Sequence, residues 1–270
     1  MTASDGLGFT SHDANLADLA VNGGTIAVSG TIDNYATAQV KQTGGAGTLT
    51  QNGTLYTLNL GNVEQYGSVL LANLGVLNAA SGTADNLNVT FAASGSSQFV
   101  NTGLTPFSFI NAGSAETAQG IALNTGTVGV FSETVVVTPT GTNASGYSGT
   151  LAPETIAVVG TVNTYAVPIL STGTVNLGAV RVGGSLAAGI VVVSDGPVAN
   201  PNQESLLYNV SGPSGVTINN GTGTVASGGS AAVGFGLNTA TAANYTGTQA
   251  TVQLTSTGAG TDGLPNTGLV

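Results

Sequence analysis

The chain has 270 residues, of which 41 % are hydrophobic and only 5 % carry a charge. Two basic residues, Lys41 and Arg181, stand against twelve acids and leave a net charge of −10. So few cations exclude a nucleic-acid-binding surface, and an anionic membrane surface would repel the chain. No cysteine is present, which excludes disulfides, thiolate metal sites and cysteine nucleophiles.

Residues 1–36 predict a polar lead-in followed by one strand. The stretch MTASDGLGFTSHD lacks the basic and apolar regions of a signal peptide. We expect a removed leader, another export signal or a piece of a longer protein. The stretch TIAVSGTI at residues 25–32 places apolar side chains at alternate positions, as in a half-buried strand.

From residue 37 onward, short apolar runs with period two alternate with Gly, Asn and Ser. They read LYTLNLGNV, LNVTFAAS and TVVVTPT in the first half, and AGIVVVSDG, GVTIN, AAVGFGLN and ATVQLTS in the second. Val, Ile and Thr favour strands, and the 42 glycines suit turns with positive φ. No stretch of 18 apolar residues occurs, so we expect no membrane insertion. The pattern predicts an all-β chain of immunoglobulin-like β-sandwiches.

Three stretches of the sequence recur. LNLGNVEQYGS at residues 58–68 returns as VNLGAVRVGGS at 175–185, and residues 121–143 match residues 235–262 with a small insertion. TIAVSGTIDNYA at 25–36 returns as TIAVVGTVNTYA at 155–166, identical at eight of twelve positions. We therefore expect module 1 at 37–166 and module 2 at 167–270. Strands at 58–63 and 175–180 would open the two sandwiches.

These stretches resemble the bacterial choice-of-anchor D modules, which belong with the ASH-type immunoglobulin-like domains. Such modules open with a strand of the kind L-x-F/L-G-x-V-x-V-G-x-S and close with one of the kind T-V-x-V-x-G-T. TIAVVGTV at residues 155–162 matches the closing strand of module 1. The middle departs from the family, because its cysteines are absent and LAPET at 151–155 only partly matches its TLAPG turn. The resemblance implies two tandem sandwiches of an exported surface protein and no particular ligand.

One strand lies outside this order. Module 2 shows no closing strand after residue 256, whereas a strand of the closing type stands at residues 25–32, ahead of any module that it could close. If a neighbouring copy donates that strand, ladder hydrogen bonds and docked side chains would join copies head to tail into a filament. The donor residues would be Thr25, Ile26, Ala27, Val28, Ser29, Gly30, Thr31 and Ile32, and the acceptor groove would contain Val175, Leu177, Val180, Ala250, Val252 and Leu254.

Two alternatives stay open. The chain can be an excerpt of a tandem-repeat adhesin stalk or surface-layer protein that presents a binding tip, with residues 25–32 closing an upstream module. The N-terminal strand can also fold back onto module 2 of its own chain, although the connection looks too short. In each case we expect a structural protein outside the cell or at its surface, with copies of itself as partner.

We expect no enzymatic activity and no cofactor. His12 is the one histidine, and it lies in the polar lead-in. A structural calcium ion at a module junction is the one metal that we consider, because Asp33 and Glu154 flank the repeated closing strands. TGAGTDGLP at residues 257–265 resembles one repeat of a calcium-binding β-roll, which needs tandem copies, so we expect an ordinary turn there.

Overall fold

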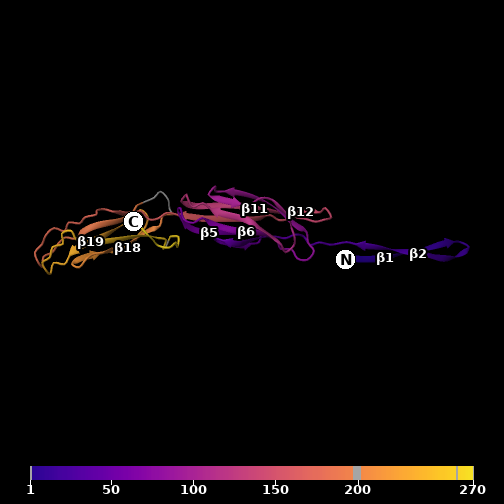
Figure 1. Ribbon diagram of the computed structural model, residues 1–270, viewed down its shortest axis with the longest axis horizontal. Coiled ribbons are helices and arrows are strands. Elements are labelled where there is room, and N and C mark those ends of the chain that lie inside the picture. The colour runs from indigo at the N-terminus through magenta and orange to yellow at the C-terminus, as the bar shows by residue number, and fades with distance from the viewer. Residues whose placement is uncertain (1, 197–201, 260, 270) are drawn as a thin grey trace.

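The computed structural model describes residues 2–196, 202–259 and 261–269 (Figure 1). In these residues every regular element is a strand, so the predicted all-β class is confirmed. Two sandwiches follow one another in a row, and a two-stranded hairpin extends from the end of module 1 that faces away from module 2 (Figure 1). None of the described residues form a helix of the length and hydropathy that crossing a bilayer requires.

The N-terminal hairpin consists of β1 (Thr2–Asp13) and β2 (Leu16–Ser29), which pair antiparallel. The prediction of a polar linker before a single strand was wrong. Asn15 N donates to Asp13 Oδ1 at 2.8 Å within the turn, and His12 Nδ1 lies 2.5 Å from Asp18 Oδ1 across the two strands. The polar residues therefore form the turn of a hairpin, and side chains pair beside it.

Module 1 is a sandwich of two sheets. Its strands are β3 (Ala38–Gly45), β4 (Thr48–Asn52), β5 (Leu55–Glu64), β6 (Leu70–Asn78), β7 (Asn86–Gly95), β8 (Phe99–Thr102), β9 (Phe107–Ile110), β10 (Ala115–Leu123), β11 (Gly129–Thr142), β12 (Ser148–Thr150) and β13 (Glu154–Asn163). One sheet has the order β3-β6-β10-β8, and the other has the order β4-β5-β13-β11-β7-β9 with β12 beside β11. Only β5 and β13 are parallel neighbours among these strands.

Module 2 repeats this plan with shorter sheets. Its strands are β14 (Pro168–Leu170), β15 (Gly189–Asp195), β16 (Ser205–Ser211), β17 (Val216–Asn219), β18 (Thr222–Val225), β19 (Ser230–Leu237), β20 (Thr251–Thr257) and β21 (Thr267–Gly268). The two orders are β14-β15-β19-β17 and β18-β16-β20-β21. β20 and β16 correspond to β11 and β7, because Leu254 faces Tyr208 as Val137 faces Phe91.

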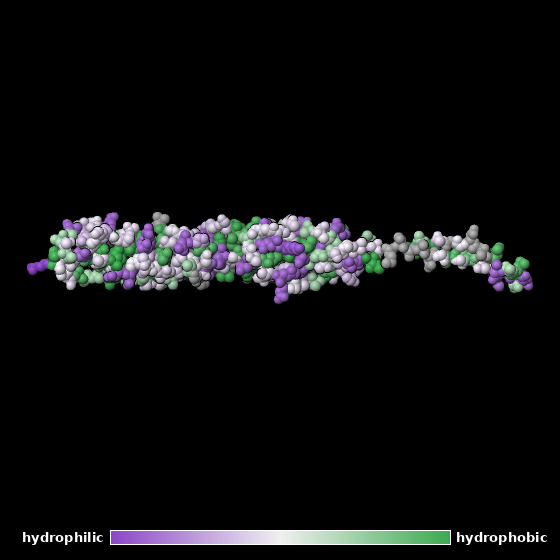
Figure 2. Space-filling model, turned by 90° about the horizontal axis from the view of Figure 1, so that it is seen from below, coloured by the Kyte–Doolittle hydropathy of each residue, from purple (hydrophilic) through white to green (hydrophobic). Residues whose placement is uncertain are grey.

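Each sandwich has its own hydrophobic core, and the two cores differ in size. Among the described residues, 20 buried hydrophobic side chains form the core of module 1 and seven form that of module 2. The outer surface is mostly pale in Figure 2, since Thr, Ser and Gly supply much of it, with small hydrophobic and hydrophilic patches between. Module 2 is therefore the less completely packed of the two sandwiches.

Candidate functional site

The closing strand of module 1 shows how such a strand is held. β13 lies between β11, to which it is antiparallel, and β5, to which it is parallel. Its side chains Ile156, Val158 and Val162 are 2 %, 0 % and 0 % exposed. The strand thus completes a sheet on both of its edges and fills the core at the same time.

In the described part of module 2, only the two-residue strand β21 lies in the corresponding place. β20 pairs with β16 along one edge, and on the other edge β21 faces only Thr255 and Ser256. Within the described ranges, no strand pairs with the remainder of that edge, from Thr251 to Leu254, apart from one hydrogen bond from Leu269 N to Leu254 O. An open sheet edge of this kind is a template for another strand. We call the space beside Ala250–Leu254 the open slot.

The predicted opening strand at residues 175–180 is not a strand. The equivalent strand of module 1, β5, was predicted at 58–63 and is observed at Leu55–Glu64. β5 obtains its ladder bonds from β13 on one edge and β4 on the other. No described strand of module 2 pairs with residues 175–180, because β21 is too short to extend beside them, and these residues remain irregular.

Residues 175–180 nevertheless keep the local shape of β5. Gly61 and Gly178 both have positive φ, at 91° and 74°. Each glycine N–H donates to the side-chain oxygen of the asparagine two residues earlier, Asn59 or Asn176, at 2.9 Å. The same turn conformation in both modules confirms that these two segments are structural repeats.

A second contact fixes the end of this segment in both modules. Tyr66 N donates to Thr125 O at 2.9 Å, and Gly183 N donates to Thr239 O at 2.8 Å. Both threonine hydroxyls also donate back to the next residue, to the carbonyls of Gly67 and Gly184, at 2.9 Å. Residues 175–184 are therefore held against the body of module 2 in the position of an opening strand, without its ladder.

The open slot leaves apolar side chains of module 2 half-buried. Val135 and Val137 of β11 are fully buried, whereas Val252 and Leu254, at the equivalent positions of β20, are only half-buried. The remaining predicted groove residues are half-buried or exposed; they are Val175, Leu177, Val180 and Ala250. Val175 and Leu177 rest on the backbone of Gly189. Of these six residues, Val252 and Leu254 pack against the core of module 2 and leave part of their surface uncovered.

The predicted donor segment lies at the other end of the molecule. Of its eight residues, Thr25, Ile26, Ala27, Val28 and Ser29 belong to β2, and Gly30, Thr31 and Ile32 continue without regular structure. Ile26, Val28 and Ile32 are 55 %, 57 % and 93 % exposed. β1 occupies one edge of β2, and no described strand pairs with the other edge. The three large apolar side chains of the segment are thus mostly exposed.

The chain enters the two modules in the same way. Asn34 forms an isolated parallel bridge with Ala84, and Thr164 forms one with Gln203. Ala36 and Ala166, two residues after these bridges, are both buried. The segment before Asn34 therefore stands to module 1 as β13 stands to module 2. Fold-back is wrong for this structure, since the hairpin and module 2 lie at opposite ends of module 1 (Figure 1).

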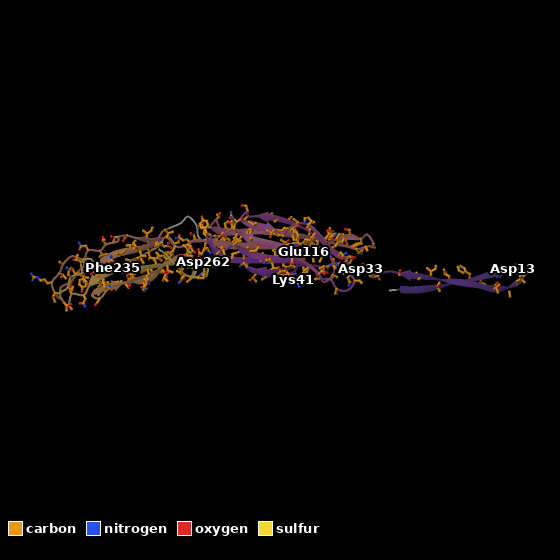
Figure 3. All side chains as sticks on the ribbon, in the orientation of Figure 1. Asp13, Asp33, Lys41, Glu116, Phe235 and Asp262 are labelled. Atoms are coloured by element: carbon orange, nitrogen blue, oxygen red, sulfur yellow. The ribbon has the colours of Figure 1, made fainter. Side chains whose placement is uncertain are left out.

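Three carboxylates meet where module 1 joins module 2. Glu64 ends β5, Glu204 precedes β16, and Asp262 lies in the loop after β20. One oxygen of each lies within 4.8 Å of the others. Burial, the neighbouring carboxyl group and charge of Glu204, and the charge of Asp262 raise the pKa of Glu64 to about 8. Figure 3 places Asp262 at this junction.

The acids chosen from the sequence for such a junction are elsewhere. Asp33 is exposed at the hairpin end of module 1, as Figure 3 shows, and beside it lies an open cavity of about 620 Å³. Glu154 is buried inside module 1, where Tyr56 Oη donates to its Oε1 at 3.4 Å. Sequence reasoning missed Glu64, Glu204 and Asp262 because they are far apart along the chain. His12 contacts Asp18 on the hairpin, away from these acids.

Comparisons with known proteins give only weak structural likenesses. No protein-family model and no curated protein matches the chain. Solved structures that are similar to it include the ASH/PapD-like domain 7 of human CEP192 (8 % identity, TM-score 0.33, covering 51 % of this chain and 93 % of that one). A second is a Porphyromonas gingivalis W83 protein of unknown function (14 % identity, TM-score 0.32, covering 74 % of this chain and 82 % of that one). A third is the Escherichia coli chaperone DraB (12 % identity, TM-score 0.27, covering 83 % of this chain and 92 % of that one). Likenesses this weak say nothing about function.

Proposed function

We propose that the chain is the structural subunit of an extracellular or cell-surface filament. Residues 25–32 of one copy enter the open slot of module 2 in the next copy, and the contact repeats head to tail. The observation that carries this proposal is the pairing of an unfilled closing position in module 2 with an uncovered strand of closing type at the opposite end of the chain. Such a contact is heterologous and propagates unless it closes into a ring.

The register follows from module 1. Ile156 faces Val135 in module 1, so Ile26 would face Val252 in the slot, and Val28 would face Ala250. β21 and Leu269 occupy only the positions opposite Leu254–Ser256 and leave this stretch open. A strand with one free edge is sufficient for pairing with β20. Exchange of β1 for residues 175–180 on the other edge would restore the arrangement seen in module 1.

The N-terminal hairpin is expected to be unstable by itself. A two-stranded hairpin alone is marginally stable in water, because it has no face on which to bury its side chains. β1 and β2 carry Leu7, Phe9, Ile26 and Val28 with roughly half of each surface exposed. Docking in the slot would cover these side chains on the donor and the half-buried ones on the acceptor. Both partners therefore gain buried apolar surface in the same contact.

The joint inside the chain suggests which side chains meet between copies. Gly67 N donates to Glu64 O at 2.8 Å, and Gly184 N donates to Arg181 O at 2.9 Å, so Arg181 holds the position of Glu64 in module 2. Glu64 lies beside Glu204 of the module that follows it. Between copies, Arg181 would lie beside the residue that takes the place of Glu204 in module 1.

Asp85 takes that place. Asp85 N donates to Asn34 O at 2.9 Å, as Glu204 N donates to Thr164 O at 2.9 Å. Asp85 is buried, and Asn143 Nδ2 donates to its Oδ1 at 2.8 Å. Arg181 of the copy that accepts the strand would thus meet Asp85 of the copy that donates it. This charge complementarity supports the order in which the ends join, in a chain that has only two basic residues.

Equivalent glycines lie next to Asp85 and Glu204. A Cβ placed on Gly141 would lie 3.4 Å from Asp85 Oδ2, and one placed on Gly258 would lie 2.9 Å from Glu204 Oε1. Gly141 and Gly258 occupy matching positions at the ends of β11 and β20. The outer joint would therefore repeat the geometry of the inner one, with opposite charges in place of like charges.

The experiment is negative-stain electron microscopy of the intact chain beside a chain that lacks residues 1–30. The deletion stops there because Thr83 Oγ1 donates to Ile32 O, and Asn34 and Ala36 belong to the entry into module 1. We expect filaments from the intact chain and single two-lobed particles from the truncated one. Filaments from both chains, or single particles from both, would overturn strand donation.

A second candidate is a segment of a tandem-repeat stalk or surface-layer protein. The hydrogen bond from Leu269 N to Leu254 O favours it, because Leu269 then takes the position of Glu154, the first residue of β13. A chain that continued from this position would close module 2 by itself. Single two-lobed particles from both chains would be the result that this candidate predicts.

A further inference from the structure

We propose that the joint between the two modules binds one calcium ion through Glu64, Glu204 and Asp262. We call these three residues the joint carboxylates. Glu64 comes from module 1, whereas Glu204 and Asp262 come from module 2, so a bound ion would connect the two sandwiches. The site lies within one chain, and it stands or falls independently of the filament.

The joint carboxylates form a compact and buried set of oxygens. One oxygen of each lies within 4.8 Å of the other two. Glu204 is 1 % exposed; Ser256 Oγ donates to its Oε2 at 2.6 Å, and its Oε1 is buried without a partner in the described structure. Both oxygens of Glu64 and Oδ2 of Asp262 are likewise buried and unpartnered there. Buried carboxylates without partners are costly unless a cation or a proton is present.

A side chain outside the acid set, that of Asn163, lies beside Glu64 in the sheet and lines the same cavity as Asp262. Asn163, at the end of β13, is 3 % exposed, and its Nδ2 has no hydrogen-bond partner among the described residues. Asn163 is the register partner of Glu64 and lines a cavity of about 300 Å³ together with Asp262. Because the two ends of an amide are interchangeable by rotation, this side chain can present its oxygen to an ion. An amide and three carboxylates are oxygen ligands suited to calcium.

The loop that carries Asp262 is built to hold the carboxylate in place. The backbone N–H groups of Thr261, Asp262 and Gly263 all donate to Gly258 O, at 2.9 to 3.1 Å. Asn62 Nδ2 of module 1 donates to the backbone carbonyl of Asp262 at 2.8 Å. Residues 261–263 thus turn back onto Gly258, and this turn contacts module 1.

In the described structure, no Lys or Arg side chain forms an ion pair with the joint carboxylates. Lys41 lies in β3 and Arg181 in the irregular segment between β14 and β15, and the described residues place neither of them in an ion pair. The negative charge of the three carboxylates must therefore be neutralised by a proton or by a metal ion. Calcium suits the site better than magnesium does, because calcium accepts six to eight oxygens in flexible geometry, whereas magnesium requires a near-ideal octahedron and keeps its waters.

The test is isothermal titration of CaCl₂ into the intact chain after treatment with EDTA and dialysis. We expect one site with a Kd between about 10⁻⁵ and 10⁻³ M, the range of weak sensor and extracellular sites. Glu204→Gln and Asp262→Asn should each weaken binding at least about tenfold, since each removes a charged ligand. Asp262→Asn can keep the bond from Leu264 N to Oδ1, so its fold should persist even if Glu204→Gln unfolds module 2.

The matched control is Asp33→Asn, an acid at the opposite end of module 1, which should leave the Kd unchanged. A titration with MgCl₂ should give weaker binding than one with CaCl₂. The proposal is overturned if the intact chain releases no heat with CaCl₂, if magnesium binds as tightly, or if Asp262→Asn binds calcium like the intact chain. In the first case the joint carboxylates share a proton instead of an ion.

Discussion

Replacing Val28 by aspartate should prevent assembly while leaving the single chain folded. Val28 is 57 % exposed on the free hairpin, so a charged side chain costs little there. In the slot it would take the place of Val158, which is 0 % exposed. The substitution therefore acts on the joint between copies and not on the fold of either module.

The magnitude can be worked out from these exposures. Complete burial of a valine contributes about 1.5 kcal/mol at the low end of the range, and covering 57 % of its surface contributes roughly 1 kcal/mol. The aspartate must in addition be protonated or held in an apolar site. Protonation at pH 7 of a carboxyl with an ordinary pKa costs about 4 kcal/mol, which local rearrangement can reduce. We expect a total of roughly 3 to 5 kcal/mol, or an association constant lowered about 150- to 4,000-fold.

The assay is the critical concentration for filament formation, measured by sedimentation and light scattering. Ala27→Asp is the matched control, because Ala157, its counterpart on β13, is exposed at the sheet surface. We expect Ala27→Asp to assemble within a few-fold of the intact chain. Equal losses in both variants, or no loss with Val28→Asp, would refute the assignment of Val28 to the buried face of the donor.

Three further predictions follow from the same structure. Arg181→Glu should raise the critical concentration about tenfold, because it places a like charge beside Asp85. Lys41→Glu changes the net charge equally and should not raise the critical concentration. Equal effects of the two substitutions would contradict the proposed contact. A chain extended after Val270 by a Gly/Ser linker and TIAVSGTI should stay monomeric and unfold at a higher temperature, because it fills its own slot; continued assembly would argue against the slot. Burial raises the pKa of Glu133 and of Glu154 in the folded chain. Above about pH 4.5, the folded chain therefore still holds protons that the unfolded chain has released. Stability should therefore fall as pH rises from 4.5 through the folded pKa values, and Glu133→Gln should reduce that fall in the thermal midpoint.

The sequence predicted those parts of the fold that depend on local pattern. The period-two runs identified an all-β chain, and the repeat of NLG-x-V located β5 and its counterpart at residues 175–180. The counterpart was wrong as a strand, because a strand also needs a ladder partner, and the partner of β5 is β13. Gly178 keeps the conformation of Gly61 although the ladder is missing.

The parts that could not be predicted depend on contacts between distant residues. SHDAN looked like a linker because its residues are polar, yet the pairing of His12 with Asp18 places them beside a hairpin turn. Glu64 and Glu204 are more than a hundred residues apart in the sequence. Only the docking of the two modules brings the joint carboxylates together. Aligning the two modules gives a partial signal, since Glu64 and Arg181 occupy equivalent positions.

Cysteine cross-linking tests the central claim most directly, because the chain contains no cysteine of its own. Thr134 faces Ala157 in module 1, so Ala27 of one copy should face Thr251 of the next, at a separation that a disulfide can bridge. The hairpin and module 2 lie at opposite ends of the molecule, so the bond can form only between copies (Figure 1).

The measurement is non-reducing gel electrophoresis of an oxidised chain that carries Ala27→Cys and Thr251→Cys. Strand donation predicts a ladder of dimers, trimers and longer species. A chain with Ser11→Cys and Thr251→Cys, in which the first cysteine lies near the hairpin turn, should stay monomeric. Monomers from both chains, or the same ladder from both, would contradict the proposed joint.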